Sequence, residues 1–227
     1  MAATSRDWAF LTGLGIIWGA SFMATRFAVA DFGPFSLAGL RLVLAALALH
    51  AVLLVRGERP PGLRTPEERR FWAMAAAAGF LANAMPFTLL GWAQARIDSS
   101  LAGVLMTTVP FFVLPLAHAF VPGERLTLRK MLGVTVGFSG AAVLIGPGAL
   151  LELGSGDRVE VLAQVACLGT AFGYASGSIV SRLAPQLGHL RFGAAALTLA
   201  ACMALPVAVA VEEPFGHVPG WEAAAAL

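Results

Sequence analysis

Seven long apolar segments follow one another along this chain of 227 residues, and they constrain its fold more than any other feature. Four stretches contain no charged residue at all: 71–95, 131–151, 161–181 and 192–211. A hydrocarbon core about 30 Å thick needs about 20 apolar residues in a helix. In lipid a backbone can satisfy its hydrogen bonds only within helices or closed barrels, and these segments show no strand-like alternation. The sequence therefore predicts an all-α integral membrane protein, a polytopic helical bundle.

The composition agrees with this class and excludes others. Hydrophobic residues make up 58% of the chain and charged residues only 12%, against about 25% charged residues in a soluble domain. No basic stripe with interleaved aromatic residues is present, so we expect the lipid bilayer as a partner and no nucleic acid. The two cysteines both lie in apolar segments, which argues against a disulfide or a metal site. We therefore expect no metal and no cofactor.

The apolar segments and the charges between them predict a topology. We expect spans near 8–30, 34–55, 71–95, 99–121, 131–151, 160–181 and 191–211, with the start of an eighth at 221–227. Eleven Arg and Lys residues lie in or beside the loops assigned to one side, against three on the other. Because cytoplasmic loops carry an excess of Lys and Arg, the N-terminus is predicted to be cytoplasmic.

One helix start can be predicted from a local motif. Thr65 is followed by Pro66 and, three positions after the threonine, by Glu68. A threonine cap, a proline at the first helical position and a glutamate at the third form a capping box. The third helix is therefore predicted to begin at Pro66.

A short internal similarity suggests a repeat. The sequence Leu-Gly-Ile-Ile-Trp-Gly at 14–19 is matched by Leu-Gly-Thr-Ala-Phe-Gly at 168–173. Five spans separate the copies, and an odd number means that the second copy crosses the membrane in the opposite direction. Inverted repeats of this kind are common in secondary transporters, with the site at the repeat interface. Chance similarity is the alternative, because Leu, Gly and Ala are abundant here. We predict one five-helix repeat over 8–151 and an incomplete second one over 160–227.

Four short motifs occur together in this chain. They are Trp18-Gly19, Pro34 followed by Arg41, Thr-Thr-Val-Pro at 107–110, and Pro-Gly-Glu-Arg-Leu at 122–126. In this combination the chain resembles the EamA family of the drug/metabolite transporter superfamily. The resemblance implies ten spans in two inverted five-helix repeats, of which about seven complete spans are present here. It also implies cytoplasmic termini and transport of small metabolites, often export, and we expect the bacterial inner membrane as the location.

Five polar or aromatic residues within the spans are candidates for binding a small-molecule substrate: Trp18, Arg41, Asn83, Gln164 and Tyr174. Arg41 lies about seven residues into its span, roughly 10 Å deep. A charge at that depth is costly and tends to face a cavity or a partner. The alternative is structural: Arg41 could bind helix-end carbonyls or extend to the interface. For the other four the alternative is hydrogen bonding between helices, worth about 0.6–2 kcal/mol each.

Glycines at a spacing of four residues mark helix faces that can approach closely. Such pairs occur at 15 and 19, at 133 and 137, and at 169, 173 and 177. Small residues at this spacing let two helix backbones come together in a membrane. We predict packing within one chain, and contact with a second copy in a homodimer is the alternative.

These observations favour a secondary transporter of small polar metabolites, an exporter, working by alternating access, and not an enzyme. The chain has no phosphate-binding Gly-x-x-x-x-Gly-Lys-Ser/Thr motif, so it is not an ATP-driven motor. One alternative is a membrane scaffold or partner subunit that does not transport, or a truncated fragment of a transporter. Another is a membrane-embedded serine hydrolase using Ser21 or Ser176, although no His or Asp lies at a matching depth to activate either hydroxyl.

Overall fold

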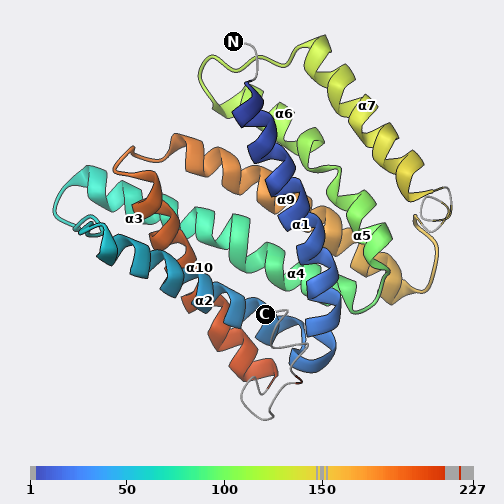
Figure 1. Cartoon of the computed structure of the whole chain (residues 1–227), viewed down its shortest axis with the longest axis horizontal. Coiled ribbons are helices and arrows are strands. Elements are labelled where there is room, and N and C mark those ends of the chain that lie inside the picture. The colour runs from blue at the N-terminus through green and yellow to red at the C-terminus, as the bar shows by residue number, and fades with distance from the viewer. Residues whose placement is uncertain (1–3, 147, 149–150, 152, 213–219, 221–227) are drawn as a thin grey trace.

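The computed structural model describes residues 4–146, 148, 151, 153–212 and 220. Every regular element in this described part is a helix (Figure 1). In chain order the helices are α1 (Ser5–Phe32), α2 (Pro34–Val55), α3 (Pro66–Gly79), η1 (Phe80–Ala84), α4 (Met85–Gln94), α5 (Ser99–Met106), α6 (Val109–Phe120), α7 (Leu128–Ile145), α9 (Arg158–Leu183) and α10 (His189–Val211). The predicted all-α polytopic bundle is therefore confirmed.

Six helical stretches in the described residues are long and apolar enough to cross a membrane: Ser5–Thr25, Pro34–Val55, Pro66–Gln94, Ser99–Phe120, Arg158–Leu183 and His189–Val211. They coincide with six of the seven expected spans. The remaining expected span, 131–151, falls on α7 and runs into positions outside the described residues. The expected start of an eighth span, at 221–227, also lies outside the described residues. The span at 131–151 and the bounds of the two repeats stay predictions.

The helices form a bundle with two peripheral members, α1 and α7. Helix α10 packs along α2 and α3, and α9 packs along α4 and α6. Helix α1 crosses one face of the bundle, and α7 lies at its edge beside α5 and α6 (Figure 1). Helix α1 therefore lies over α2, α4 and α5 on the outside of the bundle, and its apolar side chains from Trp8 to Trp18 are mostly exposed.

The predicted capping box opens α3. The Thr65 hydroxyl accepts a hydrogen bond from the Glu68 N–H at 3.1 Å, and the Glu68 carboxylate accepts one from the Thr65 N–H at 2.9 Å. Pro66 occupies the first turn, where its missing N–H leaves no partner unsatisfied. The helix start at Pro66 is confirmed.

A π-turn interrupts the third span immediately before Pro86. Proline has no N–H, so it cannot donate to the carbonyl four residues earlier. The chain widens over η1, where the Met85 N–H donates to the Phe80 carbonyl, five residues back. One extra residue in the turn rotates the following helix by about 100° relative to an uninterrupted helix. Helix α4 thus presents a different face from the one that the phase of α3 alone would predict.

The glycines of α9 pack against this π-turn. A Cβ atom added to Gly177 would lie 2.5 Å from the Ala82 Cβ, and one added to Gly173 would lie 2.6 Å from the Leu81 carbonyl oxygen. For this helix, packing within one chain is confirmed. Gly19 and Gly137, in the other two pairs, meet no described atom within 4 Å of such a Cβ. Contact with a second chain through those faces stays a prediction.

Replacing Gly177 with alanine should destabilise the bundle. The added methyl group has no room against Ala82, and overpacking of this kind costs about 1–3 kcal/mol. The matched control is Gly137→Ala, which makes the same change on α7 where the space is open. Thermal unfolding in detergent measures both variants. Equal losses of stability would contradict the close contact between α9 and η1.

Ion pairs connect loops at one end of the bundle to the later helices. Glu124, in the connection from α6 to α7, accepts hydrogen bonds from the Lys130 ammonium at 2.7 Å and the Arg182 guanidinium at 2.9 Å. Glu58, between α2 and α3, pairs with Arg191 at 3.0 Å. The hydrogen bonds from Lys130 and then Arg182 lower the pKa of Glu124 below its ordinary value of 4.5. All these residues lie in or beside loops assigned to the same side, whose cytoplasmic placement stays a prediction.

Neutralising Glu124 should remove an acid-sensitive contribution to stability. Because its pKa is lower in the folded chain, the ionised carboxylate stabilises the fold above pH 4.5, and this contribution is lost as the pH falls through the folded value. The Glu124→Gln variant should therefore melt below the wild type near neutral pH, and the difference should shrink in acid. Melting temperatures across this range measure the effect, and Glu67→Gln, at an exposed carboxylate of α3, is the control. A difference that does not depend on pH would contradict the assignment.

Candidate functional site

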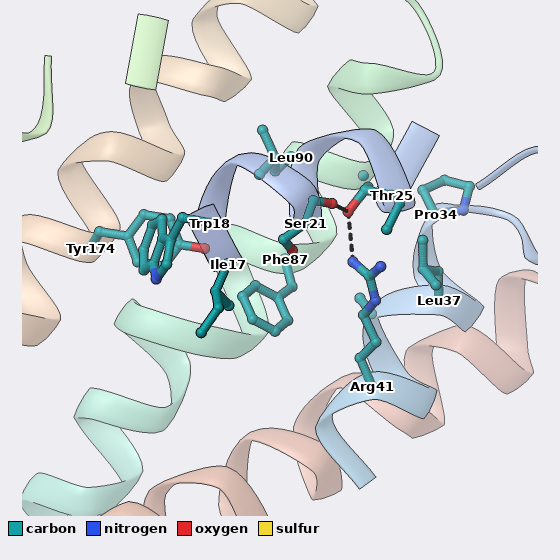
Figure 2. Close-up of a pocket in the computed structure, with 13 residues that line it drawn as sticks. Ile17, Trp18, Ser21, Thr25, Pro34, Leu37, Arg41, Phe87, Leu90 and Tyr174 are labelled. Atoms are coloured by element: carbon teal, nitrogen blue, oxygen red, sulfur yellow. Dashed lines mark hydrogen bonds between the residues drawn. The ribbon is translucent and has the colours of Figure 1, made fainter. Parts of the chain in front are cut away.

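A cavity of about 490 Å³ lies within the bundle, between α1, α2, α4 and α9 (Figure 2). Helix α1 contributes residues from Ile17 to Thr25, α2 from Pro34 to Arg41, and α4 from Phe87 to Gly91, while α9 contributes Tyr174. All four helices belong to stretches that are long enough to cross a membrane. The cavity is therefore lined by spans rather than by loops.

A cation lies at one end of this cavity. The Arg41 guanidinium donates a hydrogen bond to the Thr25 hydroxyl at 2.6 Å, and that hydroxyl donates to the Ser21 carbonyl at 2.8 Å (Figure 2). Thr25 is only 7% exposed. Because one hydroxyl both donates to its own helix and accepts from Arg41, it fixes the direction of the guanidinium. Arg41 is the one charged residue among the described lining residues, so the cavity is electropositive.

Aromatic rings form the other end. The rings of Trp18 and Tyr174 lie with their centroids 5.6 Å apart, in a tilted arrangement, and join α1 to α9. Figure 2 shows this pair on the opposite side of the cavity from Arg41, with Phe87 and Ile17 between them. Such a surface offers area for apolar contact and ring stacking. The cavity thus has a charged end and an aromatic end.

The structure brings together three of the five candidate residues: Trp18, Arg41 and Tyr174 all line the cavity. Gln164 lines a second cavity instead, where its amide oxygen accepts a hydrogen bond from the Gly154 N–H at 2.8 Å. Asn83 lies in η1 and lines neither cavity, and its amide nitrogen donates to the Ala78 carbonyl at 3.5 Å. Substrate binding by all five residues stays a prediction.

Thr25 was not identified from the sequence. Threonine is common in transmembrane helices, where its hydroxyl usually donates to the preceding turn, so its type alone carries no signal. The position of Thr25 relative to Gly33 does indicate its role. Thr25 lies eight positions before that glycine in the sequence, and Arg41 lies eight positions after it. In two antiparallel helices joined by a tight turn, such residues lie at about the same depth.

Among the residues that the structure describes, the cavity offers no arrangement typical of a metal site or a serine hydrolase. Among the described residues, no group of three or more His, Cys, Asp or Glu side chains is placed to hold a metal ion. Ser21 lines the cavity, but its described lining includes no His, Asp or Glu that could act as a base. What the arrangement can do is bind a small solute that has an anionic group and a less polar part.

Removing the Thr25 hydroxyl should weaken the fold around Arg41. The Thr25→Val variant keeps the shape of the side chain but leaves the guanidinium without this acceptor. Loss of a hydrogen bond to a charged, part-buried group costs about 1.5–3 kcal/mol. Thermal unfolding in detergent should show that loss, and Thr25→Ser, which retains the hydroxyl, should stay close to the wild type. Equal stability of the valine and serine variants would show that the contact contributes nothing.

Comparison with known proteins gives a family-level match. The sequence model of the EamA-like transporter family matches residues 8–146. This range contains most of the cavity lining, from Ile17 to Gly91, and ends before α9.

Curated relatives show the same kinship. The chain is 29% identical over 172 residues to the "Uncharacterized inner membrane transporter YedA" of Escherichia coli K12, covering 75% of this chain and 53% of that protein. It is also 29% identical to a "Probable terminal-alkyne amino-acid exporter" of Streptantibioticus cattleyicolor, covering 73% and 53% of the two chains. A "Probable amino-acid metabolite efflux pump" of Escherichia coli K12 is 27% identical, with 74% and 50% covered. The chain spans about half the length of these relatives.

A solved crystal structure has a similar fold. Its TM-score is 0.63 at 21% sequence identity, and the match covers 93% of this chain and 71% of the other. At this identity the similarity shows the fold alone. It supports the helical arrangement on which the geometry of the cavity depends.

Proposed function

The chain belongs to the EamA-like transporter family, and from that membership we propose that it is a secondary transporter that exports small polar metabolites by alternating access. The family match confirms the resemblance seen in the sequence motifs, and the names of the relatives support a membrane transporter. Substrate class, direction and mechanism are the parts that we propose. The single observation that carries the substrate class is the cavity with Arg41 at one end, and the proposed direction is supported by the exporter and efflux names of two relatives.

The size of the cavity supports a metabolite as the substrate. Small-molecule sites usually have volumes of about 300–1,000 Å³, and this one measures about 490 Å³. It is lined by residues of the spanning helices α1, α2, α4 and α9, and secondary transporters likewise build their substrate sites from spanning helices. A solute of metabolite size would fit among the lining residues.

The charge distribution supports an anionic group on that metabolite. Arg41 is the one cation and no carboxylate is among the described lining residues, so a carboxylate on the solute has a partner and meets no repulsion. Guanidinium binds carboxylate with two parallel hydrogen bonds when the geometry allows. Trp18 and Tyr174 would contact the less polar part of the solute. We therefore propose a carboxylate-bearing metabolite, in keeping with the amino-acid names of two relatives.

The sequence supports transport driven by a gradient rather than by ATP. The motif that would cradle the phosphates of ATP is missing from the chain, which has a single lysine, Lys130. Transport would then use the solute gradient itself or a coupled ion. The two ends of the cavity come from different helices: Arg41 is on α2, and Tyr174 is on α9. Relative movement of these helices would change the cavity's shape, as alternating access requires.

Neutralising Arg41 should abolish most transport of a carboxylate-bearing metabolite. In proteoliposomes loaded with an amino acid, the Arg41→Gln variant should exchange labelled substrate about 10- to 100-fold more slowly than the wild type. This is the effect of losing a charge-assisted hydrogen bond of about 1.5–3 kcal/mol. The Arg41→Lys variant, which retains the charge, should keep part of the activity.

The control for this experiment is Arg59→Gln, which removes an exposed cation in the connection between α2 and α3. It should transport as the wild type does. Equal flux in Arg41→Gln and the wild type would overturn the role of Arg41. No flux of any amino acid in the wild type, together with co-purification of another membrane protein, would favour the scaffold interpretation instead.

A further inference from the structure

A second cavity, of about 350 Å³, lies at the end of the bundle where α4 ends and α5 and α9 begin. It is lined by residues 94–98 and Leu101 on one side, and by Ser155, Glu160 and Gln164 on the other. It shares no lining residue with the first cavity. Its lining is mainly polar, whereas that of the first cavity is mainly apolar.

Gln94, in the lining of this cavity, has a buried side-chain amide. It is only 5% exposed, and in the described part of the chain neither its amide nitrogen nor its amide oxygen has a hydrogen-bond partner. Buried amides in proteins are almost always hydrogen-bonded, because an unpaired one loses its contacts with water and gains nothing. A solute or a water molecule in the adjoining cavity would supply the missing partner.

Both signs of charge are present in the same lining. The Arg96 guanidinium lies over the Trp92 ring, 4.1 Å from its centroid, and donates to the Trp92 carbonyl at 2.8 Å. These contacts hold the guanidinium in place while using one of its five N–H donors. On the α9 side, the Glu160 carboxylate accepts from the Asp157 N–H at 3.2 Å and lines the cavity as well. A cation and a carboxylate thus come from opposite sides, Arg96 from the end of α4 and Glu160 from the start of α9.

We propose that this second cavity binds a small zwitterion of the α-amino-acid type. Its carboxylate pairs with Arg96, its ammonium group pairs with Glu160, and its polar atoms hydrogen-bond to the Gln94 amide. A simple anion would meet Glu160 and Asp98, and a simple cation would meet Arg96, so only a solute with both charges satisfies the lining. The site goes beyond the proposed function, and its existence does not depend on whether the first cavity transports.

The test is equilibrium binding to the purified chain in nanodiscs, measured by isothermal titration calorimetry. Three probes differ by one charged group each: alanine, propionate, which lacks the ammonium group, and ethylamine, which lacks the carboxylate. Alanine should bind at least about tenfold more tightly than either analogue, because each analogue leaves one charged side chain unpaired. Equal binding of alanine and propionate, or no binding of alanine, would overturn the proposal.

Variants locate the binding. Arg96→Gln and Glu160→Gln should each weaken alanine binding about tenfold or more, and glutamine at position 160 can still accept the Asp157 N–H. The matched control is Arg158→Gln, an exposed arginine at the same end of α9, which should bind as the wild type does. Alanine binding that is unchanged in both Arg96→Gln and Glu160→Gln would place alanine in the first cavity alone, where Arg41 lies, and would overturn the second site.

Gln94→Leu separates a ligand-binding role from a structural one. It replaces the unpaired amide by an apolar group of similar size. If the amide serves the ligand, this variant should lose affinity for alanine while its melting temperature rises, since an unsatisfied buried group has been removed. A lower melting temperature with unchanged affinity would show that Gln94 is held by water or by the fold, which contradicts its role in the site.

Discussion

The whole arrangement depends on the need of a membrane-embedded backbone to satisfy its hydrogen bonds within the chain. Pro86 cannot donate to that ladder in the middle of a span. Immediately before it, the π-turn η1 keeps the Met85 N–H bonded, to the Phe80 carbonyl. The extra residue rotates α4, so that Phe87, Leu90 and Gly91 reach the cavity. The glycines of α9 then fit against the widened turn. The widened turn before Pro86 thus changes which face of the third span serves the cavity, and the glycines of α9 allow the close approach to it.

The half-buried cation Arg41 needs a polar partner, and the turn between α1 and α2 brings one to it. Gly33 has a φ of 77°, a conformation that favours glycine, and it is the one residue between the two helices. The Glu212 carboxylate, from the end of α10, accepts a hydrogen bond from the Ser36 N–H at 2.8 Å and so caps the start of α2. With the turn fixed in this way, Thr25 and Arg41 lie at the same depth, and the hydroxyl meets the guanidinium. The direction of Arg41 is therefore set by contacts on three helices.

Apolar length was enough to predict the fold class and six of the spans. Local motifs were enough to predict the start of α3 and the family. The cavity was predictable in part: polar and aromatic residues at mid-span depth include Trp18, Arg41 and Tyr174. Asn83 satisfies the same rule, but it lies in the π-turn, where the helix phase changes, and nothing in the sequence gives the extent of that turn. Gln164 satisfies the rule by its residue type, and its position along α9 places it in the lining of the second cavity. Thr25 was missed because pairing across a turn requires the turn geometry.

The two cavities differ in charge, but helices α4 and α9 contribute lining residues to both. Helix α4 contributes residues up to Gly91 to the first and Gln94 to the second, and α9 contributes Tyr174 and Gln164. Between them lies an apolar cluster that includes Ala93, Ala163 and Cys167, all fully buried. Apolar contacts have no directional bonds to break, so two helices can part and meet again there at a cost that grows only with the area exposed. The cluster therefore joins α4 to α9 by apolar packing, along the stretch of each helix that lies between its residues in the two cavities.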